Sequence, residues 1–253
     1  MTSLDRVRRT CATWACFATF MGASATALPL VPLFFLLPSR SRKRAGKVVT
    51  GGFFRLFTAL MRGLGVLDLE IRDPAALERD GLFIVANHPT LIDFVVLASV
   101  VPRADCLVKS ALLDHWAMRW PVSLAGYIAN DRGEETVELC RESLNAGNSV
   151  VLFPEGTRTP PGASPDFRKG AAQLALRCGR PVTPVVIRCA DSNLHKGGPW
   201  YVVPLKKPRM VLIPLKAEDS VETLRRHGGQ YHPAARALNA LLERRIQEVL
   251  ERD

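Results

Sequence analysis

The chain has 253 residues, of which 47% are hydrophobic, and it carries a formal net charge of +10. This length and apolar content allow a packed core in one large domain, or in one domain with a small appendage, and they exclude a globally disordered chain. The excess of basic residues indicates an anionic partner, which leaves nucleic acid, an anionic membrane surface and an acidic substrate as candidates.

The positive charge is concentrated near the N-terminus. Residues 1–50 contain eight Lys and Arg residues against one acidic residue, Asp5, so this segment carries +7 of the total +10. The basic residues flank an apolar run and do not alternate with aromatic residues, so we expect membrane lipids as partners and no nucleic acid. The six cysteines include no C-x-x-C pair, which indicates reduced, mostly buried thiols in a protein that faces the cytosol.

The first predicted element is a hydrophobic run, residues 10–39, which contains no charged side chain and is long enough to cross a bilayer. Four residues that disfavour a continuous helix interrupt it: Gly22, Pro29, Pro32 and Pro38. Two geometries therefore stay open, a single span and a re-entrant hairpin with both ends in the cytoplasm. A cleaved signal peptide is the alternative, and the apolar residues 28–37 that follow its cleavage site disfavour it. The basic cluster at 40–47 is expected to stay cytoplasmic.

The segment 52–64 is a second candidate for contact with a membrane. Arg55 and Arg62 are seven residues apart, so they share one helical face, with Phe and Leu side chains around the rest. We expect an amphipathic helix in the membrane interface, and a core helix with two extended arginines is the alternative. Together these segments predict an N-terminal membrane anchor over residues 1–66, followed by a catalytic domain over residues 67–253.

After residue 66, short apolar runs alternate with helical stretches. Strands are predicted at 67–71, 82–86, 105–108, 150–153, 182–187 and 209–214. Helices are predicted at 92–100, 134–146, 170–178 and 232–253. This alternation predicts an α/β fold with a central, mostly parallel or mixed sheet flanked by helices.

Polar residues follow the predicted strand 82–86 directly, in the order Asn87-His88-Pro89-Thr90-Leu91-Ile92-Asp93. In α/β sheets, ligands bind beyond the carboxyl ends of the strands. Pro89 predicts a turn that places Asp93 near the start of the next helix and folds its carboxylate back against the imidazole of His88. The carboxylate would then fix the tautomer and stabilise the imidazolium, which makes His88 a candidate general base.

A second polar loop, Pro154-Glu155-Gly156-Thr157-Arg158, follows the predicted strand that ends at Phe153. Arg158 suits bidentate binding of a phosphate, and Gly156 lets backbone amides approach the same anion. The sequence contains no G-x-S-x-G motif, no cysteine beside a candidate histidine and no metal-ligand spacing. A general base beside an anion site, without a nucleophile of its own, predicts transfer to the hydroxyl of a phosphorylated or acidic acceptor.

The motif Asn87-His88-x-x-x-x-Asp93, together with Phe153-Pro154-Glu155-Gly156-Thr157-Arg158, resembles the glycerolipid acyltransferase family, which includes the 1-acyl-sn-glycerol-3-phosphate acyltransferases. The likeness continues through residues 167–171 and 181–185. The spacing of His88 and Asp93 is not specific alone, because it occurs by chance in many proteins. Its combination with Phe153–Arg158, about sixty residues later, is specific.

The resemblance implies transfer of a fatty acyl group from acyl-CoA or acyl-carrier protein to a lysophospholipid, with 1-acyl-sn-glycerol-3-phosphate giving phosphatidic acid. His88 would be the general base and Asp93 would orient it. The residues implied or proposed to bind the acceptor are Glu155, Gly156, Thr157, Arg158, Lys109, Arg132 and Lys169. No cofactor and no metal are expected. The expected location is the inner, cytoplasmic membrane, with the catalytic domain facing the cytoplasm.

Three alternatives stay open. The segment that ends at Arg132 matches the family's second motif poorly, so another lyso-lipid acceptor, such as an ornithine lipid or a polyene-type lipid, is the first. A membrane-anchored phosphoesterase is the second, although the metal ligands that it would need are not found in the sequence. A peripheral lipid-binding protein without enzymatic activity is the third.

Overall fold

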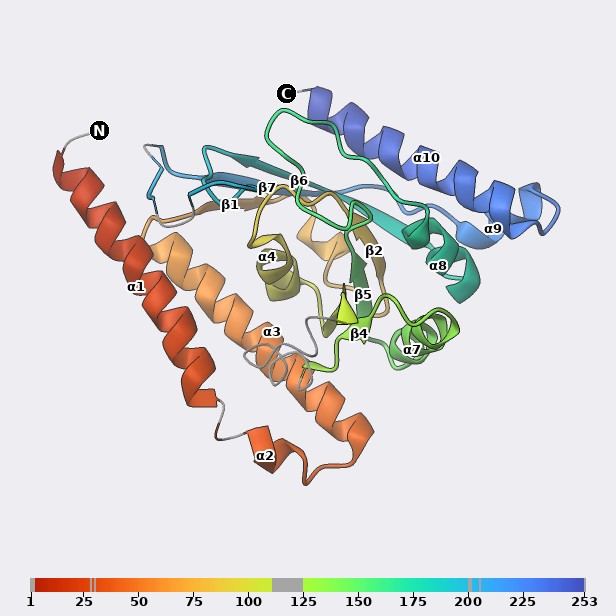
Figure 1. Cartoon of the computed structure of the whole chain (residues 1–253), viewed down its shortest axis with the longest axis horizontal. Helices are drawn as coiled ribbons and strands as arrows, with labels where there is room; N and C mark the ends of the chain where they lie inside the picture. The colour runs from red at the N-terminus through yellow and green to blue at the C-terminus, as the bar shows by residue number, and fades with distance from the viewer. Residues whose placement is uncertain are drawn as a thin grey trace.

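The computed structural model describes residues 3–27, 29, 31–110, 125–199, 202–204 and 206–252. Within this part of the chain, seven strands form one sheet in the order β1-β7-β6-β2-β5-β3-β4 (Figure 1). Its strands are β1 (Asp68–Ile71), β2 (Phe83–Ala86), β3 (Ala104–Val108), β4 (Ile128–Ala129), β5 (Ser149–Leu152), β6 (Val182–Ala190) and β7 (Arg209–Pro214). Neighbouring strands are parallel except for β6 and β7, which are antiparallel. The prediction of an α/β fold with a mostly parallel, mixed sheet is confirmed.

The central strands are short apolar runs because both faces of the sheet are covered. All four residues of β2 are buried. Alternate side chains point to opposite faces, so Phe83 and Val85 join one core while Ile84 and Ala86 join the other. One core is completed by α7, α8 and α10, and the other by α3 and α4.

The helices of the α/β body are α4 (Asp93–Val100), α7 (Glu134–Asn145), α8 (Gly170–Cys178), α9 (Ser220–Arg226) and α10 (Tyr231–Glu251). Four of them lie within two residues of the predicted bounds. The sequence analysis missed α9 and the two-residue strand β4. An aspartate before a helical stretch is a sequence signal for a helix start, and Asp219 precedes α9. Its side chain accepts hydrogen bonds from the amides of Val221 and Glu222 as an N-cap.

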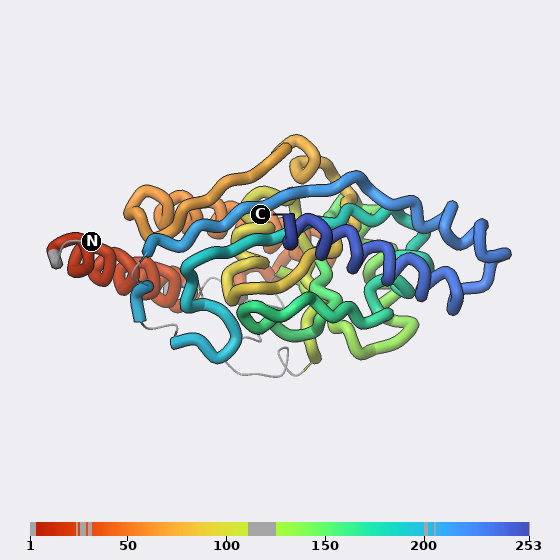
Figure 2. The backbone as a smooth tube through the Cα atoms, turned by 90° about the horizontal axis from the view of Figure 1, so that it is seen from above, coloured from red at the N-terminus to blue at the C-terminus, as the bar shows by residue number. Residues whose placement is uncertain are grey.

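The N-terminal segment forms α1 (Ser3–Ala27), α2 (Val31–Phe34) and α3 (Ser39–Gly63). Figures 1 and 2 show α1 lying along α3, with α2 at the turn between them. No helix in the described ranges combines the length and the apolar character that a bilayer crossing requires, so the predicted transmembrane helix is not found. The charge-free run divides near Pro29 and Pro32, and within α1 its apolar residues alternate with Thr, Ser and Gly.

The predicted amphipathic segment 52–64 lies in the second half of α3. Phe57 and Met61 are buried against the sheet, while Leu56 is 72% exposed. Arg55 donates a hydrogen bond to the carbonyl of Ser99 at the end of α4. One face of the segment therefore belongs to the core, as in the core-helix alternative, and the opposite face is open.

The basic cluster at 40–47 also divides between the surface and the interior. Lys47 forms a 3.1 Å ion pair with Asp105 of β3, and these two side chains are 3% and 1% exposed. The hydroxyl of Ser143 in α7 donates to the same carboxylate. This buried ion pair connects α3 to the sheet, so Lys47 is unavailable to a membrane surface.

Candidate active site

His88 and Asp93 meet just beyond the carboxyl end of β2. The imidazole Nδ1 lies 2.8 Å from Asp93 Oδ2, as the turn predicted at Pro89 requires. Asp93 opens α4 and its side chain is fully buried, while the side chain of His88 remains 22% exposed. Because Nδ1 is bonded to Asp93, Nε2 is the ring nitrogen that this pair leaves available.

The buried carboxylate of Asp93 is held by several donors. The Thr90 amide donates to Oδ2 over 2.7 Å, and the Thr90 hydroxyl donates to Oδ1. Burial raises the pKa of Asp93, and the hydrogen bond and charge of His88 and the donors of Thr90 oppose that rise. The position of Asp93 in the first turn of α4 also favours a negative charge.

The imidazole ring is fixed by a stacking contact as well. The ring of Phe153, the residue after β5, lies 4.3 Å from the His88 ring, centroid to centroid, at an interplanar angle of 25°. Phe153 was part of the sequence motif, but its stacking on His88 was not predicted. The stacking and the bond to Asp93 together restrict the direction in which Nε2 points.

Glu155 lies against the backbone of His88. One carboxylate oxygen accepts the His88 amide at 2.9 Å, and the other accepts the Thr159 hydroxyl at 2.5 Å. The Thr159 amide in turn donates to the His88 carbonyl at 2.8 Å. Both backbone groups of His88 are thus bound by the second loop. Burial raises the pKa of Glu155, and the donors from Thr159 and His88 oppose the rise.

The sequence analysis placed Glu155 on the acceptor, whereas in the structure its carboxylate binds the loop that carries His88. Thr159 was not predicted, because no local pattern distinguishes it from other threonines. Asn87 has a similar structural function. Its amide exchanges two hydrogen bonds with the backbone of Ile187, at 2.8 and 2.7 Å, and so joins β2 to β6 at the site.

The remaining residues of the second loop are more open. Gly156 has a φ of 66°, a left-handed conformation that favours glycine, and the guanidinium of Arg168 lies beside it. Thr157 is exposed. Arg158 donates to the carbonyls of Leu194 and His195 at 3.0 and 3.3 Å, so part of its guanidinium is already used within the protein. Arg168 is a cation at this loop that the site prediction did not include.

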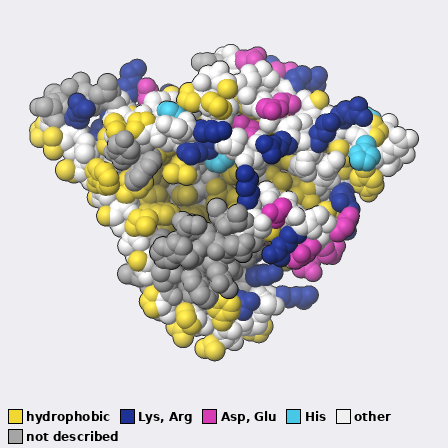
Figure 3. Space-filling model, viewed as in Figure 1, with side chains coloured by type: hydrophobic (Ala, Val, Ile, Leu, Met, Phe, Trp, Pro, Cys, Tyr) yellow, Lys and Arg dark blue, Asp and Glu magenta, His cyan; other side chains and the backbone are white. Residues whose placement is uncertain are grey.

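Of the other predicted cations, Lys109 and Arg132 follow strands that lie farther along the same edge of the sheet. Lys169 adjoins Arg168, whose amide donates to the carbonyl of Pro154 in the second loop. Lys109 follows β3 and is exposed, and Arg132 follows β4 and forms a 3.1 Å ion pair with Glu135. Lys169 precedes α8 and is exposed. Figure 3 shows Lys and Arg side chains across the middle and the right of the face in view.

A histidine bonded to a buried carboxylate at the carboxyl edge of a mostly parallel sheet has the arrangement of groups that general-base catalysis requires. The family model described as Acyltransferase matches residues 68–188, which include both motifs. The human 1-acyl-sn-glycerol-3-phosphate acyltransferase beta is 30% identical over 202 residues, which cover 72% of this chain and 67% of the human protein. The chain belongs to the acyltransferase family.

Other relatives agree with this assignment. A 1-acyl-sn-glycerol-3-phosphate acyltransferase of Pseudomonas aeruginosa is 28% identical over 67% of this chain and 68% of its own length. A chloroplastic enzyme of the same description from Brassica napus is 26% identical over 68% of this chain, which spans only 52% of that relative. The fold is similar to that of the 1-acyl-sn-glycerophosphate acyltransferase PlsC from Thermotoga maritima. The TM-score is 0.66 at 19% identity, over 98% of this chain and 100% of that one.

Proposed function

We propose that this protein transfers a fatty acyl group from acyl-CoA or acyl-carrier protein to the hydroxyl of 1-acyl-sn-glycerol-3-phosphate, which gives phosphatidic acid. The observation that carries the proposal is the His88–Asp93 pair at 2.8 Å in a chain of the acyltransferase family. The acceptor is named from the relatives, which are described as acyltransferases of this substrate.

The proposed reaction needs no covalent enzyme intermediate. His88 Nε2 takes the proton of the acceptor hydroxyl as its oxygen attacks the thioester carbonyl. The C–S bond of the thioester breaks, and the imidazolium returns the proton to the leaving sulfur, which departs as a thiol. Asp93 stabilises the imidazolium through Nδ1 and stays ionised throughout.

The phosphate of the acceptor is assigned to the cations around this site. The Gly156 amide already donates to the carbonyl of Phe153 at 3.1 Å, so the donors of Arg158 that Leu194 and His195 do not use are the first candidates, because an arginine fork suits a phosphate. Thr157, Lys169, Lys109 and Arg132 remain candidates at the same edge. Glu155 acts differently in this proposal, because its carboxylate holds the His88 backbone and would repel a phosphate.

Association with the membrane is assigned to the N-terminal helices, which would lie in the interface and not cross it. Hydrophobic side chains gather over α1 and around the turn between α2 and α3 (Figure 3). They include Leu4, Met21, Leu33 and Leu36, which are 77%, 66%, 59% and 81% exposed. Exposed apolar side chains beside basic ones are typical of an interfacial helix. We place the protein at the cytoplasmic face of the inner membrane, where a lysophospholipid acceptor is at hand.

Purified protein in detergent, given lysophosphatidic acid and oleoyl-CoA or acyl-carrier protein, should release free thiol and form phosphatidic acid in equal amounts. His88→Ala should lower that rate by at least about 100-fold, the usual effect of losing a general base. His232→Ala, which removes an exposed histidine at the start of α10, is the matched control and should have no effect. An unchanged rate in His88→Ala would refute the mechanism.

The same assay separates the remaining acceptors. A lyso-ornithine lipid and a polyene alcohol are tested separately in the same assay. Because thiol release reports acyl transfer to any hydroxyl, the compound that supports release is the acceptor. Binding to phospholipid vesicles without thiol release from any donor would instead support a lipid-binding protein without activity.

A further inference from the structure

Thr90, in the turn between β2 and α4, contacts both oxygens of the Asp93 carboxylate. Its amide donates to Oδ2 at 2.7 Å, and its hydroxyl donates to Oδ1. The imidazole Nδ1 of His88 lies 2.8 Å from Oδ2. Thr90 is 1% exposed and Asp93 is 0% exposed, so water does not compete for these bonds. Of the three groups that hold this carboxylate within the described part of the chain, two therefore belong to Thr90.

The local sequence explains why Thr90 and Asp93 meet. The segment Thr90-Leu91-Ile92-Asp93 has the spacing of a capping box, in which a threonine stands three residues before an acidic residue at the start of a helix. As in a capping box, the acidic side chain accepts the amide of the threonine. The hydroxyl departs from that arrangement, because it donates to the carboxylate itself. The start of α4 and the orientation of Asp93 toward His88 therefore depend on the same spacing.

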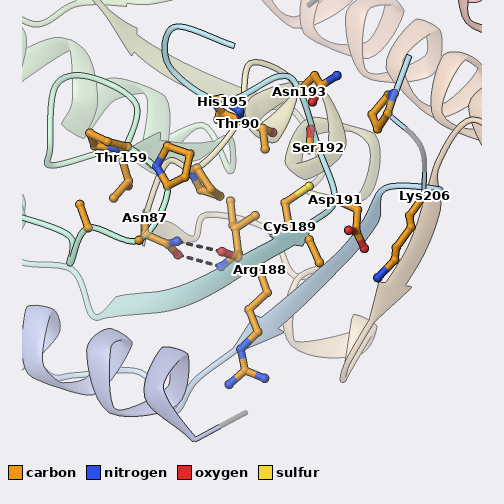
Figure 4. A pocket seen from close by; sticks show the side chains of 18 of the residues that line it. Asn87, Thr90, Thr159, Arg188, Cys189, Asp191, Ser192, Asn193, His195 and Lys206 are labelled. Carbon is orange, nitrogen blue, oxygen red and sulfur yellow. Dashed lines mark hydrogen bonds between the residues drawn. The ribbon is translucent and has the colours of Figure 1, made fainter. Parts of the chain in front are cut away.

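The Thr90 hydroxyl is committed to Asp93 even though the residue borders a pocket. Thr90 lines the pocket drawn in Figure 4, together with Asn87 and Thr159. A threonine hydroxyl carries one hydrogen, and that hydrogen is directed at Asp93. Thr90 thus has no side-chain hydrogen left to donate to a ligand, and its hydroxyl can affect the reaction only through Asp93.

The ionised form of Asp93 depends on its hydrogen-bond donors. Burial raises the pKa of this carboxyl group, and the hydrogen bond and charge of His88 oppose the rise together with the two donors of Thr90. Hydrogen bonds to an ionised carboxylate favour the ionised form. Without the hydroxyl, Oδ1 would be a buried oxygen without its donor, and the His88–Asp93 pair would hold a proton more tightly.

The other titratable side chains coupled to Asp93 are Glu155 and Cys189. Burial raises the pKa of Glu155, in the second loop, and the negative charge of Asp93 adds to that rise. Burial and the charge of Asp93 also raise the pKa of Cys189, at the end of β6, to about 12, so this thiol is neutral near pH 7. Neither side chain supplies a cation to Asp93, so the positive charge that opposes its burial comes from His88.

Charged groups on the helix and strand packed against α4 have other partners. Arg55 of α3 donates to the carbonyl of Ser99, at the far end of α4. Asp105 of β3 forms its ion pair with Lys47. The hydroxyl of Thr90 is therefore the neutral donor that can be removed from Asp93 without a change in the charges around it.

We propose that Thr90 is a positioning residue for the reaction, whose hydroxyl holds the Asp93 carboxylate ionised and directed at His88 Nδ1. The inference rests on the proposed function, in which His88 takes a proton from the acceptor while Asp93 stays ionised. Loss of the hydroxyl should let the pair retain a proton to higher pH. At a given pH on the acidic side, fewer molecules would then have a base that is free to accept the substrate proton.

The kinetic test compares Thr90→Ala with Thr90→Ser, because these two variants differ from each other only in the hydroxyl. Thier kcat/KM is measured against pH by thiol release. In Thr90→Ala the acidic limb should move up by about one to two pH units, because one hydrogen bond to a charged group is lost. The rate should be about 10- to 100-fold below wild type on that limb and should approach the wild-type rate above it. Thr90→Ser should keep the wild-type limb.

Ser99→Ala is the matched control on the same helix. The Ser99 hydroxyl is buried near the other end of α4, where it donates to the carbonyl of Val96 at 2.7 Å. Its removal should leave the acidic limb and kcat unchanged. A deficit of Thr90→Ala that is equal at every pH would indicate a structural role alone and would overturn the proposal. An equal shift of the limb in Thr90→Ser would overturn it as well.

A measurement without substrate separates this inference from the proposed reaction. Nitrogen NMR of the full chain in detergent, with isotope-labelled histidine, reports the protonation of the His88 ring, and His88→Ala assigns its signals. The midpoint of this titration should rise by about one to two pH units in Thr90→Ala and should return in Thr90→Ser. If the midpoint moves but no acceptor is acylated, the proposed function fails and the effect of Thr90 on the pair stands. A midpoint that stays at the wild-type value refutes the role of Thr90.

Discussion

Among the residues that the structure describes, two buried aspartates pair with a basic side chain, and one of these two pairs is open to a substrate. Asp93 bonds to His88 at the rim of the sheet, and Asp105 pairs with Lys47 beneath α3. In both, burial raises the pKa of the aspartate while the basic partner and a hydroxyl, from Thr90 or Ser143, oppose the rise. The carboxylates are therefore in similar surroundings.

The difference lies in the partner. The side chain of His88 is 22% exposed and keeps one nitrogen free of Asp93, whereas the side chain of Lys47 is 3% exposed and enclosed. An enclosed pair has no atom to offer a substrate, so it connects elements, here α3 with β3. A buried aspartate beside a basic group is thus no sign of catalysis unless the basic group reaches solvent.

Replacing each aspartate by asparagine should show the largest difference between the two pairs, in kcat. Asp93→Asn should lower kcat on the order of 100- to 10,000-fold, because the asparagine amide favours the wrong tautomer of His88. Asp105→Asn should leave the rate per folded molecule nearly unchanged. Thiol release, normalised to the folded fraction by circular dichroism, measures both. A comparable loss of kcat in Asp105→Asn would show that the distinction drawn here is wrong.

Removing the enclosed cation should act on stability. Lys47→Met should reduce the free energy of unfolding by about 3–5 kcal/mol, because Asp105 is left as an unpaired buried charge. Lys207→Met, whose side chain is 42% exposed and 4.0 Å from Asp68, should change it by less than about 0.5 kcal/mol. Urea unfolding in detergent measures both free energies of unfolding. Equal losses in the two variants would mean that the buried ion pair stabilises the fold no more than a surface ion pair does.

The stability deficit of Lys47→Met should also depend on pH. The pKa of Asp105 in the folded state lies above its usual value. At a pH between the two values the folded state therefore binds more protons than the unfolded state. Stability then falls as the pH rises through the folded pKa. Lys47 opposes this rise, so its loss moves the folded pKa of Asp105 further up. The deficit should be smallest in acid, where Asp105 is protonated, and should grow toward pH 7. A deficit that is constant between pH 4 and 7 would contradict this account.

The smallest effect is expected at Glu155. Glu155→Gln should lower kcat about tenfold, because a charged hydrogen bond to the His88 backbone becomes a neutral one, and should leave the KM for the acceptor unchanged. Arg158→Ala is the comparison, and its main effect should be a higher KM. Steady-state kinetics with varied acceptor separates the two. A raised KM with unchanged kcat in Glu155→Gln would return Glu155 to the acceptor site, where the sequence motif had placed it.

Local pattern was sufficient for the strands, most helices of the α/β body and the pairing of His88 with Asp93. A strand with both faces buried can be predicted from a short apolar run in the sequence. A turn that brings His88 and Asp93 together can likewise be predicted from Pro89. These features depend on neighbours in the chain. The strand ending at Ala86 and the strand ending at Leu152 could likewise be expected to bring both polar loops to one edge.

Contacts between distant segments decided the rest. Glu155 binds the His88 backbone because β2 and β5 are adjacent, and Lys47 is buried because one face of α3 packs on α4 and β3. The hydrophobic run near the N-terminus was long enough for a membrane span by composition, but its prolines divide it and α1 folds back along α3. The sequence by itself determined which residues favour a strand, a helix or a turn. Only the tertiary structure determined which side chains are enclosed and which reach a ligand, because that depends on packing between residues far apart in the chain.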